Sequence, residues 1–203
     1  MQATLAVPEK PRPGEEQRLN ILVIATLVIA LLIGWGIKTS AEGRTRTLTA
    51  LGGALSLRYP AAWVAGQATD ETTLLTVSDP RSSAALNPTF SVLALPMPKD
   101  QRLLDAATNW ALSQSRVLRE FQDLGTEQTF LSGHLAVRLN YAYIADPPEG
   151  SGPATLPIVA RATATLVAYG DQLLIFNAVS DASQYDEYGP RLAQIAASIW
   201  LAK

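Results

Sequence analysis

The side chains that could do acid–base or nucleophilic chemistry are few. His134 is the only histidine among 203 residues, and it follows Ser132 and Gly133. A histidine can act as general base for a serine nucleophile, but Ser132 lies too close in sequence to suggest a triad by itself. The sequence also contains no Gly-x-Ser-x-Gly nucleophile elbow. We therefore predict that His134 is a surface turn residue and that the chain has no catalytic residue.

The acidic residues give one cluster that could hold a metal ion. Asp181, Asp186 and Glu187 lie close together in sequence near the last predicted helix. Carboxylates bind hard cations, but acidic residues also favour the N-terminus of a helix. We favour the second interpretation and predict no metal site and no cofactor. The other acidic candidates are expected in solvated turns and loops: Asp70, Glu71, Asp146 and Glu149.

Composition excludes several kinds of site and partner. The chain has no cysteine, which excludes disulfides, zinc–thiolate sites, cysteine-ligated iron–sulfur clusters and covalent haem. Gly52 and Gly53 precede a predicted strand, not a helix, so they do not form a phosphate-binding loop. The net charge is −2, from 16 basic and 18 acidic residues. We therefore expect no nucleic-acid partner, since such a partner needs a basic face.

The strands that must position these side chains are visible as alternating patterns. Alternation of apolar and polar residues is typical of strands with one buried face. In one strand Arg138 and Asn140 oppose apolar residues, and in another the polar face is Arg161, Thr163 and Thr165. The last strand follows a turn at Gly170, which predicts a hairpin. The predicted strands are residues 54–59, 72–78, 89–95, 137–143, 159–167 and 173–179.

Two helices are expected on this sheet. Apolar residues recur with a helical period from Leu103 to Phe121, with Asp100 as a possible cap and Gly125 as the end. A second helix is expected over residues 190–201, with Pro190 in its first turn. Residues 183–188 could form a preceding helical turn. The predicted fold class is therefore α/β, more closely an α+β sandwich: a central antiparallel β-sheet flanked by helices.

Residues 19–37 form an uncharged apolar run near the N-terminus. At 1.5 Å per residue this helix would be about 28 Å long, close to the thickness of a bilayer core. Trp35 suits the membrane interface, and Gly34 and Gly36 either end the helix or admit a neighbouring one. A cleaved signal peptide is the alternative, with cleavage near Ala41, but the run exceeds the usual apolar region of such peptides. We predict a retained transmembrane helix, which also helps to explain a charged fraction of only 17%.

The predicted organisation has four parts: a flexible tail (1–18), the transmembrane helix (19–37), a linker (38–45) and one folded domain (46–203). Basic residues are balanced on the two sides of the helix, so the positive-inside rule does not fix the orientation. A short tail before a large domain favours a cytoplasmic tail and an extracytoplasmic domain. The expected localisation is the cell membrane, with a single span. A proline- and glycine-rich loop at residues 146–157 is either functional or simply mobile.

The folded domain resembles the PsbP-like family. The Tyr59-Pro60-x-x-Trp63 turn is similar to the turn after the family's opening strand, and Ser78-Asp79-Pro80 is similar to its strand end. The run over residues 185–199 resembles the tyrosine-rich entry into its last helix. The resemblance implies a sheet with helices on both faces and a role as an extracytoplasmic accessory protein of complexes such as photosystem II. Some members bind divalent metals through histidine and carboxylate groups, whereas this chain has one histidine.

These observations favour a non-catalytic accessory subunit of a membrane complex that transfers electrons, photosynthetic or respiratory. Its partners would be the membrane and the other subunits of that complex. The alternative is a membrane-tethered module that binds a small molecule or lipid, which requires a concave apolar pocket with a few polar groups. An enzyme is the third possibility, and it lacks a recognisable catalytic constellation in the sequence.

Overall fold

The computed structural model describes residues 13–66, 70–146 and 156–202, and within the first helix it describes the side chains of residues 20–35. The chain divides into two compact units, residues 1–44 and Thr45–Lys203. The second unit begins one residue before the expected domain start. Each unit is described by itself below.

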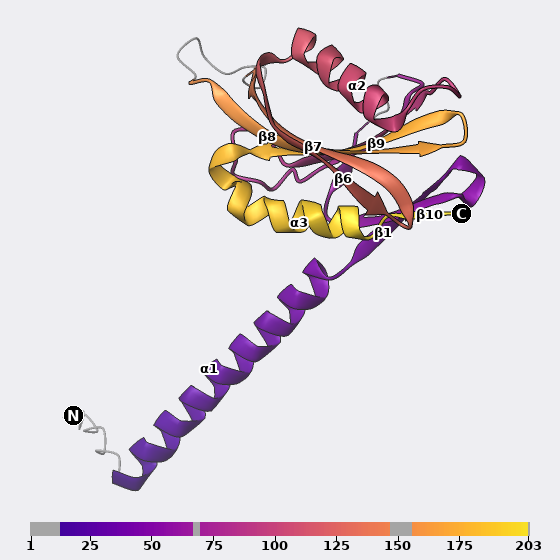
Figure 1. Ribbon diagram of the computed structural model, residues 1–203. Helices are drawn as coiled ribbons and strands as arrows, with labels where there is room; N and C mark the ends of the chain where they lie inside the picture. Colours follow the sequence, from indigo (N-terminus) through magenta and orange to yellow (C-terminus); the bar gives the residue numbers. More distant parts are fainter. Residues whose placement is uncertain (1–12, 67–69, 147–155, 203) are drawn as a thin grey trace, which may run out of the picture. The chain divides into compact units, whose positions relative to one another are not determined.

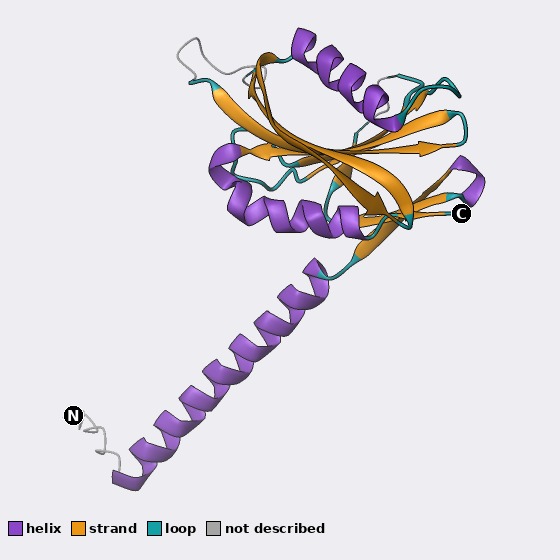
Figure 2. Cartoon of the chain, in the orientation of Figure 1, coloured by secondary structure: helices purple, strands orange, loops and turns teal. Residues whose placement is uncertain are grey.

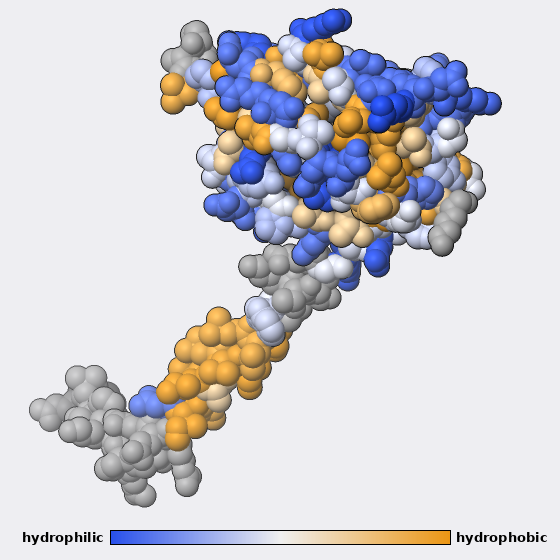
Figure 3. All heavy atoms as spheres, viewed as in Figure 1, coloured by the Kyte–Doolittle hydropathy of each residue, from blue (hydrophilic) through white to orange (hydrophobic). Residues whose placement is uncertain are grey.

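The first unit contains helix α1 (Pro13–Glu42), whose described side chains are all apolar except those of Asn20 and Thr26. Its large apolar side chains are between 48% and 71% exposed, and Figure 3 shows a continuous apolar surface on the side of the helix in view. The Thr26 hydroxyl donates to the Leu22 carbonyl at 2.8 Å, so it adds little polarity. The exposed side chains are Ile21, Leu22, Val23, Ile24, Leu27, Val28, Ile29, Leu31, Leu32, Ile33 and Trp35.

Among the residues that the structure describes, no helix is both long enough and apolar enough to cross a membrane. The expected span of residues 19–37 extends beyond the side chains described in α1, because those of residues 19, 36 and 37 lie outside them. The tail expected at residues 1–18 also lies outside the described residues, except for the helical backbone from Pro13.

The second unit is built on two antiparallel sheets (Figure 1). The larger sheet has the strand order β3-β4-β5-β9-β8-β7-β6. The smaller one is β1 (Thr45–Ala50), β2 (Leu55–Pro60) and β10 (Trp200–Leu201), with a 3-10 turn, η1 (Leu51–Gly53), between the first two. The strands of the larger sheet are β3 (Val64–Ala65), β4 (Thr73–Ser78), β5 (Thr89–Pro96), β6 (Arg119–Leu131), β7 (His134–Ala145), β8 (Ile158–Tyr169) and β9 (Gln172–Asp181).

One helix covers each face of the larger sheet (Figure 2). Helix α2 (Leu103–Val117) buries Ala106, Ala107 and Trp110 in one apolar cluster with β7, β8 and β9. Helix α3 (Tyr185–Ala197), preceded by the 3-10 turn η2 (Ala182–Gln184), packs on the opposite face with the smaller sheet. The predicted α+β fold, an antiparallel sheet flanked by helices, is therefore confirmed.

Tyr141 lies at the centre of the cluster beneath α2. It is 1% exposed, and its hydroxyl donates to Asn177 Oδ1 at 3.0 Å. Its ring contacts Trp110 edge-on at 5.8 Å and stacks on Phe121 at 5.3 Å, measured between ring centroids. Burial raises the pKa of the Tyr141 phenol, and burial also raises the pKa of neighbouring Tyr143. Both side chains are therefore held as neutral phenols.

We expect the domain to lose stability in alkali through these two phenols. In the unfolded chain they ionise near the ordinary pKa of 10.0, whereas in the fold they keep their protons to higher pH. Their contribution is complete below about pH 10 and is lost as pH rises above that value. Urea unfolding at rising pH measures this loss. Tyr141→Phe should make the alkaline decline shallower, and an unchanged decline would contradict the assignment.

The predicted helix over Leu103 to Phe121 is confirmed as far as Val117 and is wrong over its last four residues. Helix α2 ends at Val117, and Leu118 is extended, with φ −87° and ψ 131°. The chain continues as β6, whose pairing with β7 is shifted between Arg119 and Gln122 and again before Gly125. These bulges turn Leu118 and Phe121 toward the same cluster that a helix would have reached. Gly125, at φ 141°, is a bulge residue, not a helix end.

The boundaries of the last helix also differ from the prediction. Helix α3 begins at Tyr185 and ends at Ala197, so Pro190 lies inside it. Trp200, predicted to be helical, lies in β10 and pairs with Ser56 of β2. The expected cap Asp100 is also wrong, since α2 begins after Arg102 without a side-chain cap. All six predicted strands are present in the structure. The Gly170 turn, at φ 61°, joins β8 to β9 as predicted.

Candidate functional site

His134 and Ser132 hold the C-terminal strand in place. The Leu201 backbone N–H donates to Ser132 Oγ at 3.0 Å, and His134 Nε2 donates to the Ala202 carbonyl at 2.9 Å. Because a carbonyl only accepts, Nε2 carries the ring proton in this contact. Ser132, at φ 51°, forms the tight turn between β6 and β7. The pair therefore has a structural role. His134 was predicted as a surface turn residue, but it is the partly buried first residue of β7, and the turn itself is formed by Ser132 and Gly133.

The three acidic residues that were considered as a metal site lie instead at the N-termini of η2 and α3. Asp181 Oδ1 accepts from the Ser183 backbone N–H at 2.9 Å and from its hydroxyl at 2.7 Å, which caps η2. Asp186 and Glu187 lie in the first turn of α3, and Glu187 pairs with Arg191 at 3.5 Å. Within the described part of the chain, no three histidine, aspartate or glutamate side chains are close enough to hold a metal ion.

The remaining acidic candidates lie in turns at the surface. Asp70 accepts hydrogen bonds from the hydroxyls of Thr73 and Thr72, and these bonds lower its pKa. Asp146 is 3.4 Å from Arg119, with both side chains largely exposed, so this pair contributes little to stability. Glu149 lies outside the described residues.

Asp79 is a buried carboxylate whose role the sequence does not reveal. It is 3% exposed and follows β4. Oδ1 accepts from the Arg81 backbone N–H at 3.1 Å, and Oδ2 lies 4.0 Å from Arg191 on α3. Asp79 therefore links the end of β4 to α3, and this contact explains the structural role of the Ser78-Asp79-Pro80 motif.

A recess with a volume of about 450 Å³ lies between α3 and the larger sheet. Figure 1 shows α3 running across this face of the sheet. Strands β6, β7 and β8 supply one side and β5 and β9 another, while α3 forms the opposite wall. Ligand pockets in proteins commonly have volumes of about 300–1,000 Å³. We call this recess the α3 cavity.

Strand register gathers the polar residues of the α3 cavity on one wall. Glu127 pairs with Arg138, and Arg138 with Thr165, along one row of cross-strand neighbours. In the next row Asn140 pairs with Thr163. Residues directly opposite each other in antiparallel strands lie on the same face. Five polar side chains from three strands therefore share one wall of the cavity.

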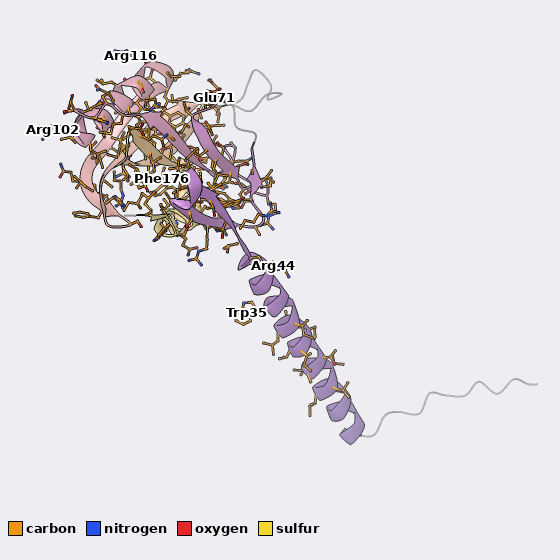
Figure 4. All side chains as sticks on the ribbon, turned by 90° about the vertical axis from the view of Figure 1, so that its right-hand side faces the viewer. Trp35, Arg44, Glu71, Arg102, Arg116 and Phe176 are labelled. Carbon is orange, nitrogen blue, oxygen red and sulfur yellow. The ribbon has the colours of Figure 1, made fainter. Side chains whose placement is uncertain are left out.

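The other walls are apolar. Phe176 in β9 is 1% exposed and lies inside the domain (Figure 4). Phe90 in β5 is fully buried and pairs with Ala178, two residues further along β9. Four of the six α3 residues that line the cavity are glycine or alanine, which leaves room for the cavity. A Cβ at Gly189 would meet the Tyr185 ring at 3.3 Å, so glycine permits that ring to pack against the helix. The α3 residues that line the cavity are Tyr185, Gly189, Leu192, Ala193, Ala196 and Ala197.

The polar groups on the cavity wall differ in how they are satisfied. Arg138 contacts Glu127 Oε1 at 3.0 Å, and the Thr163 hydroxyl donates to Asn140 Oδ1 at 2.9 Å. Thr165 is only 7% exposed, but its hydroxyl is not one of the buried side-chain atoms that lack a partner in the described part of the chain, which are Ser180 Oγ and Gln184 Oε1. The arrangement suits binding, since it offers donors and acceptors beside an apolar wall.

The two polar strand faces could be predicted from the sequence, but their place in a cavity could not. The alternation correctly placed Arg138 with Asn140, and Arg161 with Thr163 and Thr165. It could not show that Thr165 would be buried beneath α3 while Arg138 and Arg161 on the same faces stay accessible to water. Glu127 belongs to β6, which was not predicted as a strand at all.

Comparison with protein-family models finds no match, and no curated protein sequence matches the chain. Solved structures do match. Cyanobacterial PsbP (CyanoP) from Synechocystis has a TM-score of 0.58 at 15% identity, over 78% of this chain and 92% of that chain. The Ran-binding protein Mog1p of Saccharomyces cerevisiae has a TM-score of 0.52 at 13% identity, over 78% and 95% of the two chains.

A third solved structure is LpqN, involved in cell envelope biogenesis of Mycobacterium tuberculosis. Its TM-score is 0.52 at 12% identity, over 79% of this chain and 91% of that chain. At such identities the likeness is one of fold. The predicted resemblance carried by Tyr59, Pro60 and Trp63 is confirmed at that level. The Trp63 side chain is 2% exposed in the core, as a packing role requires. The Trp63 backbone N–H donates to the Pro60 carbonyl at 3.0 Å and closes the turn.

Proposed function

We propose that this chain, whose folded domain has the PsbP-like fold, is a non-catalytic accessory subunit of a membrane complex. Residues 19–37 would span the bilayer once. The domain would stand on the extracytoplasmic side and bind other subunits there, with the N-terminal tail in the cytoplasm. The likeness to a cyanobacterial PsbP supports an electron-transfer complex as the partner.

The observation that carries this proposal is the surface of α1. Eleven large apolar side chains between positions 21 and 35 are all about half exposed or more. A helix with no polar face must be covered by lipid or by other protein. Water cannot cover it without a large cost, since each buried aliphatic side chain is worth about 1.5–3 kcal/mol relative to exposure. Membrane insertion satisfies all sides of the helix at once.

A second observation supports a protein partner for the domain. Phe130 and Leu135 are direct cross-strand neighbours near the β6–β7 turn and are 72% and 51% exposed. Strand β6 is also the last strand of the larger sheet, so its outer edge lacks a neighbour among the described strands. Paired exposed apolar residues beside an open edge are features of interaction surfaces.

Gentle detergent extraction of native membranes, followed by capture through a C-terminal tag and mass spectrometry, tests the proposal. We expect a stoichiometric set of redox or light-harvesting subunits to accompany the chain. A tagged unrelated single-span protein from the same membrane is the control for carry-over. Recovery of the chain alone would contradict the accessory-subunit proposal.

One alternative function has an observation of its own. The α3 cavity has the concave form and the few converging polar groups that a membrane-tethered binding module needs. Under this alternative the chain would be recovered without partner subunits and with a bound small molecule.

A further inference from the structure

We propose that the open edge of β6 binds an extended basic segment of another protein, which joins the larger sheet as an added strand. The docking stretch is residues 126–130, with the exposed Phe130–Leu135 pair beside it. The inference rests on the proposed function, because it names the chemistry of the subunit that the domain binds. Binding would come from backbone pairing along the edge, helped by one apolar contact and by charge.

The first step of the argument is that this edge is long and only half protected. The outer strands of the larger sheet are β3, with two residues, and β6, with thirteen. Between Arg119 and Gly125 two register shifts interrupt the pairing of β6 with β7. Bulges of this kind protect an exposed edge, as do charged side chains and proline. Residues 126–131 have unbroken register, no proline and one charge, so this part of the edge is open to another strand.

The second step is the turn after β6, which sets the hydrogen-bonding pattern of the ladder. Ser132 and Gly133 have φ values of 51° and 84°, and two positive values identify a type I′ hairpin turn. A two-residue turn of this type is closed by residues that exchange both of their backbone hydrogen bonds, which here are Leu131 and His134. Along an antiparallel ladder such pairs alternate with pairs that share no hydrogen bond.

The alternation leaves the backbone groups of three residues facing outward. Counted back from the turn, the residues of β6 in pairs without a hydrogen bond are Phe130, Gln128 and Thr126. Their N–H and C=O groups turn away from β7 toward the open edge, and no backbone hydrogen bond to another described element engages them. An extended segment laid along the edge could therefore pair with all three residues in a regular ladder.

The third step is the apolar pair beside the open edge. Phe130 and Leu135 lie directly opposite each other and are 72% and 51% exposed. A residue of an added strand that lies opposite Phe130 would be on the same face of the sheet. An apolar side chain at that position would cover the exposed ring. We therefore expect the partner segment to carry an apolar residue there.

The fourth step is the charge of the edge, which decides the kind of segment. Strand β6 carries three acidic residues and one basic residue, Arg119. Arg119 and Glu127 each have an ion-pair partner on or just after β7. Glu120 and Asp123 have no ion-pair partner among the described residues, so the edge keeps two uncompensated negative charges. A basic segment complements them, whereas a second copy would bring its own acidic β6 against the same charges, which disfavours pairing.

A matched set of peptides tests this inference on the full-length chain in nanodiscs of zwitterionic lipid. The basic probe is acetyl-Lys-Val-Thr-Val-Arg-Thr-Lys-amide, and its acidic twin is acetyl-Glu-Val-Thr-Val-Glu-Thr-Glu-amide. Two isomers of the basic probe carry backbone N-methyl groups, one on both valines and the other on the first threonine and the arginine. With the first valine opposite Phe130, the valine N–H groups face β6 and the other two face away. Amide NMR of the labelled chain follows Thr126, Gln128 and Phe130, with β3 at the other edge as reference.

We expect the basic probe to shift the β6 amide signals saturably, and the acidic twin to bind at least about tenfold more weakly. The valine-methylated isomer should lose at least about tenfold in affinity through two missing hydrogen bonds, while the other isomer should bind within about twofold of the parent. Gln128→Pro removes an outward N–H without breaking the β6–β7 ladder and should weaken the basic probe by about tenfold. Gln128→Val keeps that N–H and should change the affinity little.

The same two variants separate this inference from the proposed function in native membranes. We expect the Gln128→Val chain to be recovered with its partner subunits as the unaltered chain is, and the Gln128→Pro chain to be recovered largely without them. If the unaltered chain itself has no partner subunits, the proposed function fails, and the peptide titration still decides whether the edge accepts a basic strand.

Several results would overturn the inference. One is the absence of saturable shifts in β6 with the basic probe; another is equal binding by the two methylated isomers, which would exclude backbone pairing at this edge. An acidic twin that binds as tightly as the basic probe would remove the role of charge. Shifts of the β6 amides that grow with protein concentration, without any peptide, would assign the edge to a second copy. A Gln128→Pro chain that retains all its partner subunits would place their contact elsewhere.

Discussion

Two lysines in the middle of α1, Val28→Lys with Leu32→Lys, are expected to release the chain from membranes. Both positions lie well inside residues 19–37 and are 48% and 61% exposed on the helix surface. A lysine at the centre of a spanning helix costs about 2.5–3.5 kcal/mol, so the two together cost about 5–7 kcal/mol. That is comparable to the whole insertion free energy of a helix with about a dozen aliphatic residues, each contributing about −0.3 to −0.6 kcal/mol.

Flotation on a density gradient measures this release, because membranes rise and aggregates sink. The matched control is Val28→Leu with Leu32→Ile, which changes the same two positions and keeps them apolar. We expect the control to float with the membranes and the lysine variant to stay at the bottom or in the soluble fractions. A lysine variant that floats as completely as the control would show that α1 does not anchor the chain by spanning the bilayer.

Truncation of Tyr141 is expected to give the largest loss of stability in the folded domain. Tyr141→Ala removes a ring that is 1% exposed and touches Trp110, Phe121 and Tyr143. Large-to-small changes of this kind cost about 3–5 kcal/mol. For a domain of this size each kcal/mol lowers Tm by about 2–4 °C, so Tm should fall by roughly 6–20 °C. Thermal unfolding followed by circular dichroism measures the change.

Tyr141→Phe is the matched variant that separates packing from hydrogen bonding. It keeps the ring contacts and removes the hydroxyl that donates to Asn177 Oδ1 at 3.0 Å. The loss should be about 1–3 kcal/mol, from an amide oxygen left without its donor. If Tyr141→Ala were no more destabilising than Tyr141→Phe, the ring cluster would not be the main contribution.

The strands of the fold could be predicted because their burial alternates. Leu55, Leu57 and Tyr59 are all buried in β2, as the two-residue period requires, and the polar positions between them are not. The short strands β1, β3 and β10 were missed because two-sided exposure or a length of two residues leaves no such pattern. Pairing with β2 or β4, not local sequence, makes them strands.

Strand β6 shows why pattern alone can mislead. Leu118 and Phe121 continue the helical spacing of α2, and both do pack against the cluster beneath it. The chain reaches that cluster with an extended Leu118 and a left-handed Glu120, at φ 50°. A bulged strand and a helix can place the same two side chains on one face. Pairing with β7 makes this segment a strand, and that pairing cannot be deduced from the local sequence of residues 118–121 alone.

The α3 cavity could be predicted only in part for the same reason. Arg138, Asn140, Thr163 and Thr165 were assigned to polar strand faces, and such faces usually meet water. Here α3 lies over Thr165, which is 7% exposed, and leaves the Arg138 side chain 44% exposed, since Leu192 and Ile195 bury their apolar side chains against this side of the sheet. The position of a helix over a sheet depends on contacts far apart in sequence, so neither the cavity nor the buried Asp79 could be derived from local patterns.

The proposal that the chain is held in a membrane complex is tested most directly by native electrophoresis. Membranes solubilised in a mild detergent are separated under native conditions and then, in a second dimension, under denaturing conditions. We predict that most of this 21.7 kDa chain migrates with a much larger particle, in line with a fixed set of other subunits. Migration of the whole population as the free chain, in the mildest detergent that extracts it, would contradict the claim.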